Sequence, residues 1–154
     1  MSTSVIRKVA YAVAARRHFA DADLLLSNGR QANAGQLLGL AAECGLKAIV
    51  VACGAATTQE GDVVNPQGLS GKGFKDHFPQ LEQVATQHGG LLPDTRFSTR
   101  YLARMQNLSA FSDWTVSQRY WCHSVVPIAS IPNWKLAADE VMAVLDQAQQ
   151  DGVL

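Results

Sequence analysis

The sequence predicts an all-α protein, and three observations support that class. The segment 39–53 carries only two charges, Glu43 and Lys47, which a helix would place one turn apart among small and aliphatic residues. Apolar residues recur at helical spacing through most of the chain. Apart from the weak apolar pair Val63-Val64, no stretch has the composition of a strand. We therefore expect an antiparallel up-and-down bundle of about four to five helices.

The length and composition indicate one domain over residues 1–154, because a chain of 154 residues can bury a single core. The formal net charge is zero, so the chain as a whole has no strong attraction for nucleic acid. No uninterrupted apolar run reaches about 18 residues, which predicts no membrane contact, and the first residues lack the pattern of an export signal. We therefore expect a cytoplasmic protein.

The thiol and imidazole groups do not form a recognisable metal motif. Three cysteines, Cys44, Cys53 and Cys122, are widely spaced and odd in number, which favours reduced thiols over disulfides or a zinc cluster. The four histidines show no paired ligand spacing. We expect no metal and no other cofactor.

The first half of the chain predicts a helical hairpin. Apolar positions at helical spacing run from residue 4 to about residue 28, where Asn28-Gly29 supplies a stop. A second helix is expected from about residue 32 to residue 53, closed by Gly54. The short link between them makes the two helices antiparallel.

The second half predicts a loop followed by three helices. Residues 55–73 have no sustained periodicity and many glycines, which predicts a mobile loop. A short helix follows and ends at Gly89-Gly90, and Pro93 opens another one, with apolar positions at Phe97, Tyr101, Met105, Leu108 and Phe111. Pro127 interrupts the chain, and Ser130-Ile131-Pro132 caps a final helix that runs to the end.

Arg119 and His123 are the candidate catalytic pair, because three residues separate them and one helical face would carry both. A guanidinium stabilises developing charge on a phosphate and an imidazole moves a proton, so the pair suits metal-free cleavage of RNA. In the alternative interpretation Arg119 pairs with Asp113 or Glu43, and His123 lies at a helix end with its hydrogen-bonding groups satisfied.

The remaining candidates are grouped around this pair. Glu43 and Lys47 lie in apolar surroundings, which predicts partial burial and a need for partners. We expect Arg119 to be the partner of Glu43, and His77 to line the same cleft. The last third of the sequence is rich in aromatic residues, which either stack on bases or pack in the bundle or at an interface, and we favour the core. They are Trp114, Trp121, Trp134, Tyr101, Tyr120 and Phe111.

These motifs together resemble the HEPN superfamily. The similarity rests on Ala42-Glu43-Cys44-Gly45-Leu46-Lys47-Ala48, on Lys75-Asp76-His77-x-x-x-Leu81, and on Trp114-x-x-x-x-Arg119-Tyr120. It implies an antiparallel helical bundle, usually a homodimer with a cleft at the interface. Catalytic members are metal-independent ribonucleases, many of them toxins or phage-defence effectors, with more residues between the arginine and the histidine than the three found here.

The resemblance leaves two functional hypotheses. In the first, the chain is a ribonuclease of a toxin–antitoxin or phage-defence system: Arg119 stabilises charge, His123 transfers protons, Glu43 orients the arginine, and RNA and an antitoxin are the partners. In the second, the chain is a non-catalytic module for nucleotide binding or protein interaction, often beside a nucleotidyltransferase. Arg119, Lys47 and His77 would then hold a phosphate or a partner carboxylate.

Overall fold

The computed structural model describes residues 6–154 and confirms the all-α class. Its α-helices are α1 (Tyr11–Ser27), α2 (Gln31–Ala52), α3 (Gln80–His88) and α4 (Ile131–Gln150). Short 3-10 turns and one π-helical turn form most of the segment between α3 and α4. Val63 makes only an isolated bridge with Thr57, and no strand is present in residues 6–154.

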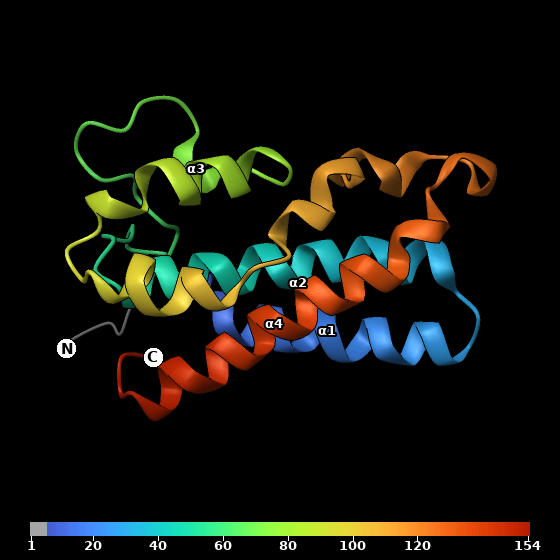
Figure 1. Ribbon diagram of the computed structural model, residues 1–154, viewed down its shortest axis with the longest axis horizontal. Helices are drawn as coiled ribbons and strands as arrows, with labels where there is room; N and C mark the ends of the chain where they lie inside the picture. Colours follow the sequence, from blue (N-terminus) through green and yellow to red (C-terminus); the bar gives the residue numbers. More distant parts are fainter. Residues whose placement is uncertain (1–5) are drawn as a thin grey trace.

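Helix α2 lies at the centre of the molecule (Figure 1). Helix α1 runs antiparallel to it, and Gly29 makes the tight link between them with a positive φ of 71°. In the view of Figure 1, helix α4 crosses in front of both. Helix α3 and the 3-10 turns of residues 108–130 lie on the side of α2 that faces away from α1. The predicted hairpin is therefore confirmed, with boundaries within one residue for α2.

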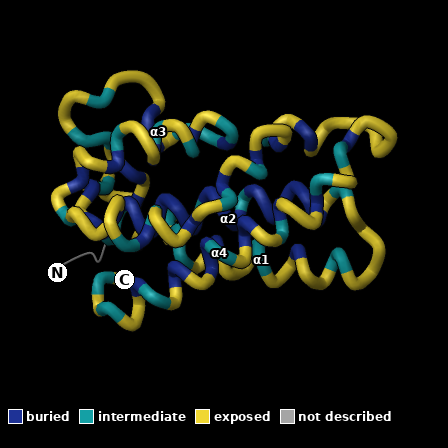
Figure 2. The backbone as a smooth tube through the Cα atoms, viewed as in Figure 1, coloured by how far each residue is buried: buried dark blue, intermediate teal, exposed yellow. Residues whose placement is uncertain are grey.

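The central position explains the composition of α2. Most of its residues are buried, in contrast to the largely exposed turns between residues 116 and 130 (Figure 2). By length and composition α2 is the one helix among the described residues that passes as a membrane span. A core helix passes the same test, and most of α2 is buried inside the chain.

Glycines on α2 allow its neighbours to approach closely. A Cβ on Gly39 would lie 1.9 Å from Trp114 Cε2, and a Cβ on Gly45 would lie 2.3 Å from Val141 Cγ1. Trp114 is fully buried in this notch, and its Nε1–H donates to the Gly35 carbonyl at 3.0 Å. The small residues of α2 are therefore sites of contact with the large residues of the second half of the chain.

The start of the first helix differs from the prediction. Residues 6–10 are not helical, and α1 begins at Tyr11 rather than near residue 4; the first five residues lie outside the described part. The Val9 N–H instead donates to the Glu60 carbonyl at 2.9 Å. This contact with the 55–73 segment replaces the first turns of the expected helix.

The predicted continuous helix after Pro93 is wrong. The segment is divided into η3 (Phe97–Tyr101), η4 (Leu102–Arg104) and η5 (Leu108–Asp113). The side chain of Glu140 on α4 accepts hydrogen bonds from the backbone N–H and the side-chain amide of Asn107, both at 2.9 Å. This tertiary contact satisfies the backbone where the helix breaks, while the predicted apolar positions are buried.

The segment 55–73 contains no helix until η1 (Gly73–Lys75), as its composition indicates. Its path is fixed by local bonds: the Asn65 amide donates to the Gly71 and Lys72 carbonyls, and its Oδ1 accepts from the Phe74 N–H at 2.9 Å. Phe74 is thereby placed in the core. The mobility of the rest of the loop stays a prediction.

The last helix begins where the sequence predicts, but not with the predicted cap. Ser130 precedes α4, and its hydroxyl bonds the Asp113 carboxylate instead of capping the helix. At the other end Asp151 accepts from Arg100 Nε at 2.7 Å and from the Tyr101 hydroxyl at 2.7 Å. These bonds hold the pKa of Asp151 well below its usual range.

Gly39→Ala should lower the free energy of unfolding by about 1–3 kcal/mol, because the new methyl group would overlap the Trp114 ring. Chemical denaturation measures this change. Gly90→Ala is the matched control, since no atom lies within 4 Å of the Cβ it adds. Equal stability of the two variants would contradict the close approach of Trp114 to α2.

Asp151→Asn should reduce stability in a pH-dependent manner. Because the folded chain binds a proton at Asp151 more weakly than the unfolded chain does, its contribution is complete at neutral pH and is lost as the pH falls below about 3.8. Denaturation curves of wild type and variant should therefore converge in acid. Asp146→Asn on α4, which removes an exposed pair with Arg16 of α1, should show a smaller difference at neutral pH.

Candidate functional site

Among the described residues, the most deeply buried charged side chain is that of Glu43 on α2. Its side chain accepts two bonds from the segment before α3: Oε1 from the Phe78 N–H at 2.8 Å and Oε2 from His77 Nδ1 at 2.9 Å. Glu43 is 2% exposed, whereas the His77 side chain is 43% exposed. A buried carboxylate therefore orients a histidine that reaches solvent.

The electrostatics of this pair follow from its burial. Burial raises the pKa of Glu43, and the hydrogen bonds from His77 and the Phe78 N–H offset part of that rise. Lys47, one turn along the helix, is 8% exposed, and its Nζ donates to the Lys75 carbonyl at 3.3 Å. The predicted burial of Glu43 and Lys47 is confirmed, and both attach the same segment to α2.

The expected pairing of Glu43 with Arg119 is wrong, because His77 occupies that position. Arg119 belongs to η6 (Val116–Tyr120), which is anchored nearer the start of α2 by the bond from Gln36 Nε2 to the Val116 carbonyl. Gln36 precedes Glu43 by seven positions, which is roughly 10 Å along the helix axis. The expected single cleft is therefore not formed, because the segments that carry His77 and Arg119 are attached at different points of α2.

The segment that carries Arg119 and His123 is not one helix. It turns to extended backbone at Trp121 and Cys122, between η6 and η7 (His123–Val125). The condition for placing Arg119 and His123 on one helical face is therefore not met. Arg119 instead donates to the Val116 carbonyl at 3.1 Å, and its guanidinium lies 4.7 Å from the centre of the Tyr120 ring.

Asp113 and Trp114 have structural contacts. The Trp134 Nε1–H donates to Asp113 Oδ1 at 2.9 Å, and Ser130 bonds the other carboxylate oxygen. Asp113 therefore fixes the start of α4 and is not the partner of Arg119. Trp114 is fully buried, which confirms the favoured packing interpretation for this residue.

Tyr120 does not follow that interpretation, because it is 78% exposed. Trp121 beside it is 44% exposed, and two aliphatic side chains of the same surface segment are also exposed: Val125 and Ile128. Large apolar groups gathered on a surface are typical of contact sites. The aromatic residues of this third of the chain are thus divided between the core and the surface.

His123 lines a hollow of about 380 Å³ at the other end of its segment, where the chain passes the start of α2. The other lining residues come from the α1–α2 link, the first turn of α2 and η8 (Ile128–Ser130): Gly29, Arg30, Gln31, Ala32, Asn33 and Ile128. Among the described residues, no side chain caps the N-terminus of α2. The first N–H groups of this long helix therefore have no side-chain cap, and Arg30 and His123 line the hollow beside them.

Sequence reasoning missed Arg30 and Asn33 as site candidates. A signal was present, because the sequence between the helix stop at Asn28-Gly29 and the next apolar face offers arginine at the cap position, where serine, threonine or aspartate is usual. What the sequence did not indicate is the return of His123 to that end of α2. That approach follows from the break at Trp121 and Cys122.

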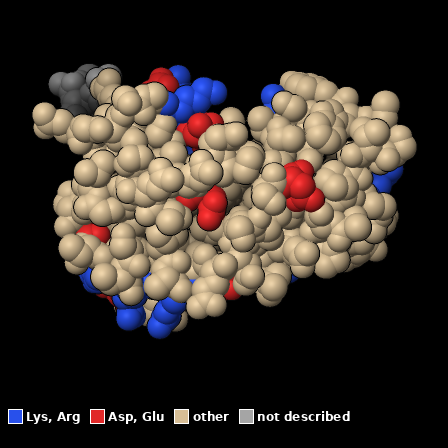
Figure 3. Space-filling model, turned by 45° about the horizontal axis from the view of Figure 1, so that its top comes forward, with Lys and Arg blue, Asp and Glu red and all other residues tan. Residues whose placement is uncertain are grey.

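The surface charge is dispersed on the face shown in Figure 3, where basic side chains lie at the margins and do not form one patch. This fits the balanced net charge of the chain. Within residues 6–154 no group of three or more His, Cys, Asp and Glu side chains is arranged to hold a metal ion. The three thiols are free, with Cys53 buried and Cys122 exposed.

Comparison of the chain with protein-family models, with characterised proteins and with solved structures gave no match.

Glu43→Ala should lower the free energy of unfolding by about 1–3 kcal/mol, because it leaves the buried Phe78 N–H without an acceptor and removes the carboxylate that binds His77. Glu43→Gln keeps an acceptor for the Phe78 N–H and should cost less. Thermal and chemical denaturation measure both. Glu60→Ala, which breaks an exposed pair with Lys8, is the control; equal losses at the two positions would refute the structural role of Glu43.

Proposed function

We propose that this chain is a non-catalytic, HEPN-like module that binds a phosphate-bearing ligand such as a nucleotide. The family resemblance implies an antiparallel helical bundle, and we propose that arrangement for this chain. The α1–α2 hairpin and the crossing of α4 over it support this arrangement (Figure 1). The central position of Glu43 and Lys47, in the motif that carries the resemblance, supports it as well.

The observation that carries the proposal is the hollow at the start of α2. It joins Arg30, His123 and the amide-bearing side chains of Gln31 and Asn33 to an uncapped helix N-terminus. Helix N-termini attract anions because their free N–H groups point along the axis and the helix dipole adds positive potential. A phosphate group satisfies those N–H groups and pairs with the arginine.

The separation of Arg119 from His123, the predicted catalytic pair, favours ligand binding over RNA cleavage. Efficient acid–base catalysis needs donors that are already oriented toward the reacting group. Arg119 is bound within its own turn and stacked on Tyr120, and it is not among the residues that line the hollow with His123. The Arg119–His123 pair is therefore not preorganised for one phosphate.

A metal-independent ribonuclease of a toxin–antitoxin or phage-defence system is the second candidate. The observation in its favour is that Arg119 and His123 are both exposed and neither pairs with a carboxylate among the described residues. RNA would then have to bring together two groups that the free chain holds on separate turns.

Partner binding is the further part of the proposal. The exposed group Tyr120, Trp121, Val125 and Ile128 supplies an apolar surface for a homodimer, an antitoxin or a nucleotidyltransferase chain. Aromatic side chains are enriched at such contacts. A cytoplasmic location is part of the same hypothesis.

ATP in the presence of EDTA should raise the melting temperature of the wild-type chain, because a ligand that binds only the folded state stabilises it by mass action. Arg30→Gln and His123→Asn should each weaken ATP binding by about tenfold, the loss expected for one charge-assisted contact. Arg104→Gln, a change of the same chemistry on an exposed turn away from the hollow, should bind like wild type.

The same preparations should be incubated with tRNA and EDTA. No ATP response, together with cleavage by wild type that is lost in the Arg119→Ala, His123→Ala double variant, would replace the binding proposal with the ribonuclease. An ATP response that survives Arg30→Gln and His123→Asn would place the ligand elsewhere and refute this site.

A further inference from the structure

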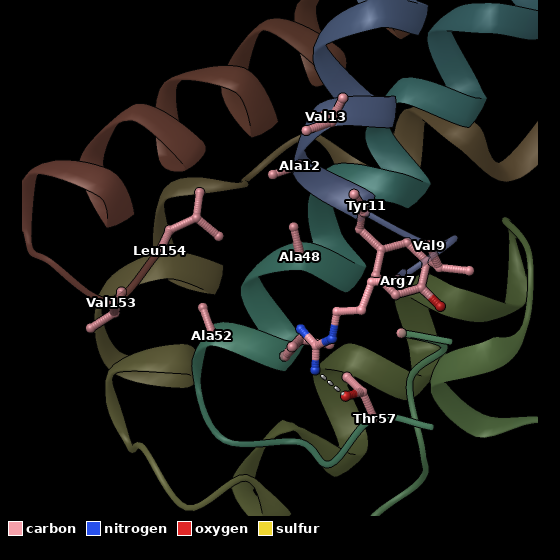
Figure 4. Close-up of a pocket in the computed structure, with 13 residues that line it drawn as sticks. Arg7, Val9, Tyr11, Ala12, Val13, Ala48, Ala52, Thr57, Val153 and Leu154 are labelled. Atoms are coloured by element: carbon pink, nitrogen blue, oxygen red, sulfur yellow. Dashed lines mark hydrogen bonds between the residues drawn. The ribbon is translucent and has the colours of Figure 1, made fainter. Parts of the chain in front are cut away.

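A second hollow, of about 360 Å³, lies at the opposite end of the hairpin (Figure 4). It is bounded by the start of α1, the end of α2, the loop at Thr57 and Gly61, and the last two residues, Val153 and Leu154. Its volume falls in the range of small-molecule pockets. It shares no residue with the hollow that contains His123.

The hollow exists because small side chains meet there. Ala12, Ala48 and Ala52 line it, so three helical positions of the wall contribute only a methyl group each. Figure 4 shows Ala48 and Ala52 along one side of the space, with Leu154 opposite Val9. Apolar walls of this kind favour an aliphatic or aromatic group.

The wall is fixed by hydrogen bonds. The Val63 N–H donates to the Tyr11 hydroxyl at 3.0 Å, and the Val9 N–H donates to the Glu60 carbonyl at 2.9 Å. Gly61 lies so close to Val9 that a Cβ there would be 2.4 Å from the Val9 carbonyl oxygen. The loop is therefore held against the start of α1, and the hollow is part of the folded structure.

Among the described residues that line this apolar space, Arg7 is the cation. Arg7 Nη2 donates to Thr57 Oγ1 at 2.9 Å, and no carboxylate of the described residues pairs with Arg7. Its neighbour Lys8 is different, because it pairs with Glu60 at 3.0 Å. In Figure 4 the guanidinium lies beside the hollow and keeps donors in addition to the one used by Thr57.

We infer that this hollow binds a small anionic amphiphile, with the carboxylate of the ligand on Arg7 and its apolar tail against Ala48 and Ala52. The anionic head of such a ligand matches the guanidinium, and its apolar tail matches the alanine side of the site. The inference is independent of the proposed phosphate site.

Decanoate, used below its micelle concentration, is a suitable probe. It should bind wild type saturably in calorimetry and shift the NMR signals of Tyr11 and Ala52. Ala52→Leu, which fills the hollow, should weaken binding at least about tenfold. Ala56→Leu is the matched control, because Ala56 is exposed and does not line the hollow, and it should bind like wild type.

The charge contact is tested separately with Arg7→Gln, and Lys8→Gln is its control. Arg7→Gln should weaken decanoate about tenfold while decanol binds both proteins equally, because only the carboxylate uses the guanidinium. Equal decanoate affinity of wild type and Ala52→Leu would overturn the inference. It would also be overturned by association with phosphatidylglycerol vesicles in the absence of saturable decanoate binding, which would indicate a membrane-binding surface instead.

Discussion

The burial of α2 on nearly all sides is the constraint on which the rest of the structure depends. A helix in that position must allow close approach of its neighbours and must satisfy its charges internally. Gly39 meets the first requirement by accepting the Trp114 ring. Glu43 meets the second by binding His77 and the Phe78 N–H. Both contacts attach segments from the second half of the chain to the hairpin of the first half.

These contacts also explain why the segment between α3 and α4 is irregular. Glu140 binds the backbone of Asn107, and Asp113 binds the Trp134 indole, so side chains of one element satisfy polar groups of another. A regular helix there would satisfy its backbone internally and would not need them. Helical regularity is therefore lost between α3 and α4 where these tertiary bonds are made.

The two hollows lie at opposite ends of the α1–α2 hairpin and differ in chemistry. The one at the link combines Arg30 and His123 with free helix N–H groups, which suits a phosphate. The one near the start of α1 combines alanine walls with a single cation at Arg7, which suits an amphiphile. The Glu43–His77 pair lies between these ends and fixes the segment before α3.

The sequence by itself determined the helical class, the hairpin and the burial of Glu43 and Lys47, because periodicity and an apolar environment are local properties of the chain. Only the tertiary structure decided the partners. In the folded chain Glu43 binds His77 rather than Arg119, and a break in the helix at Trp121 and Cys122 separates Arg119 from His123. Spacing alone does not reveal such choices, since they depend on which distant segments compete for the same buried group.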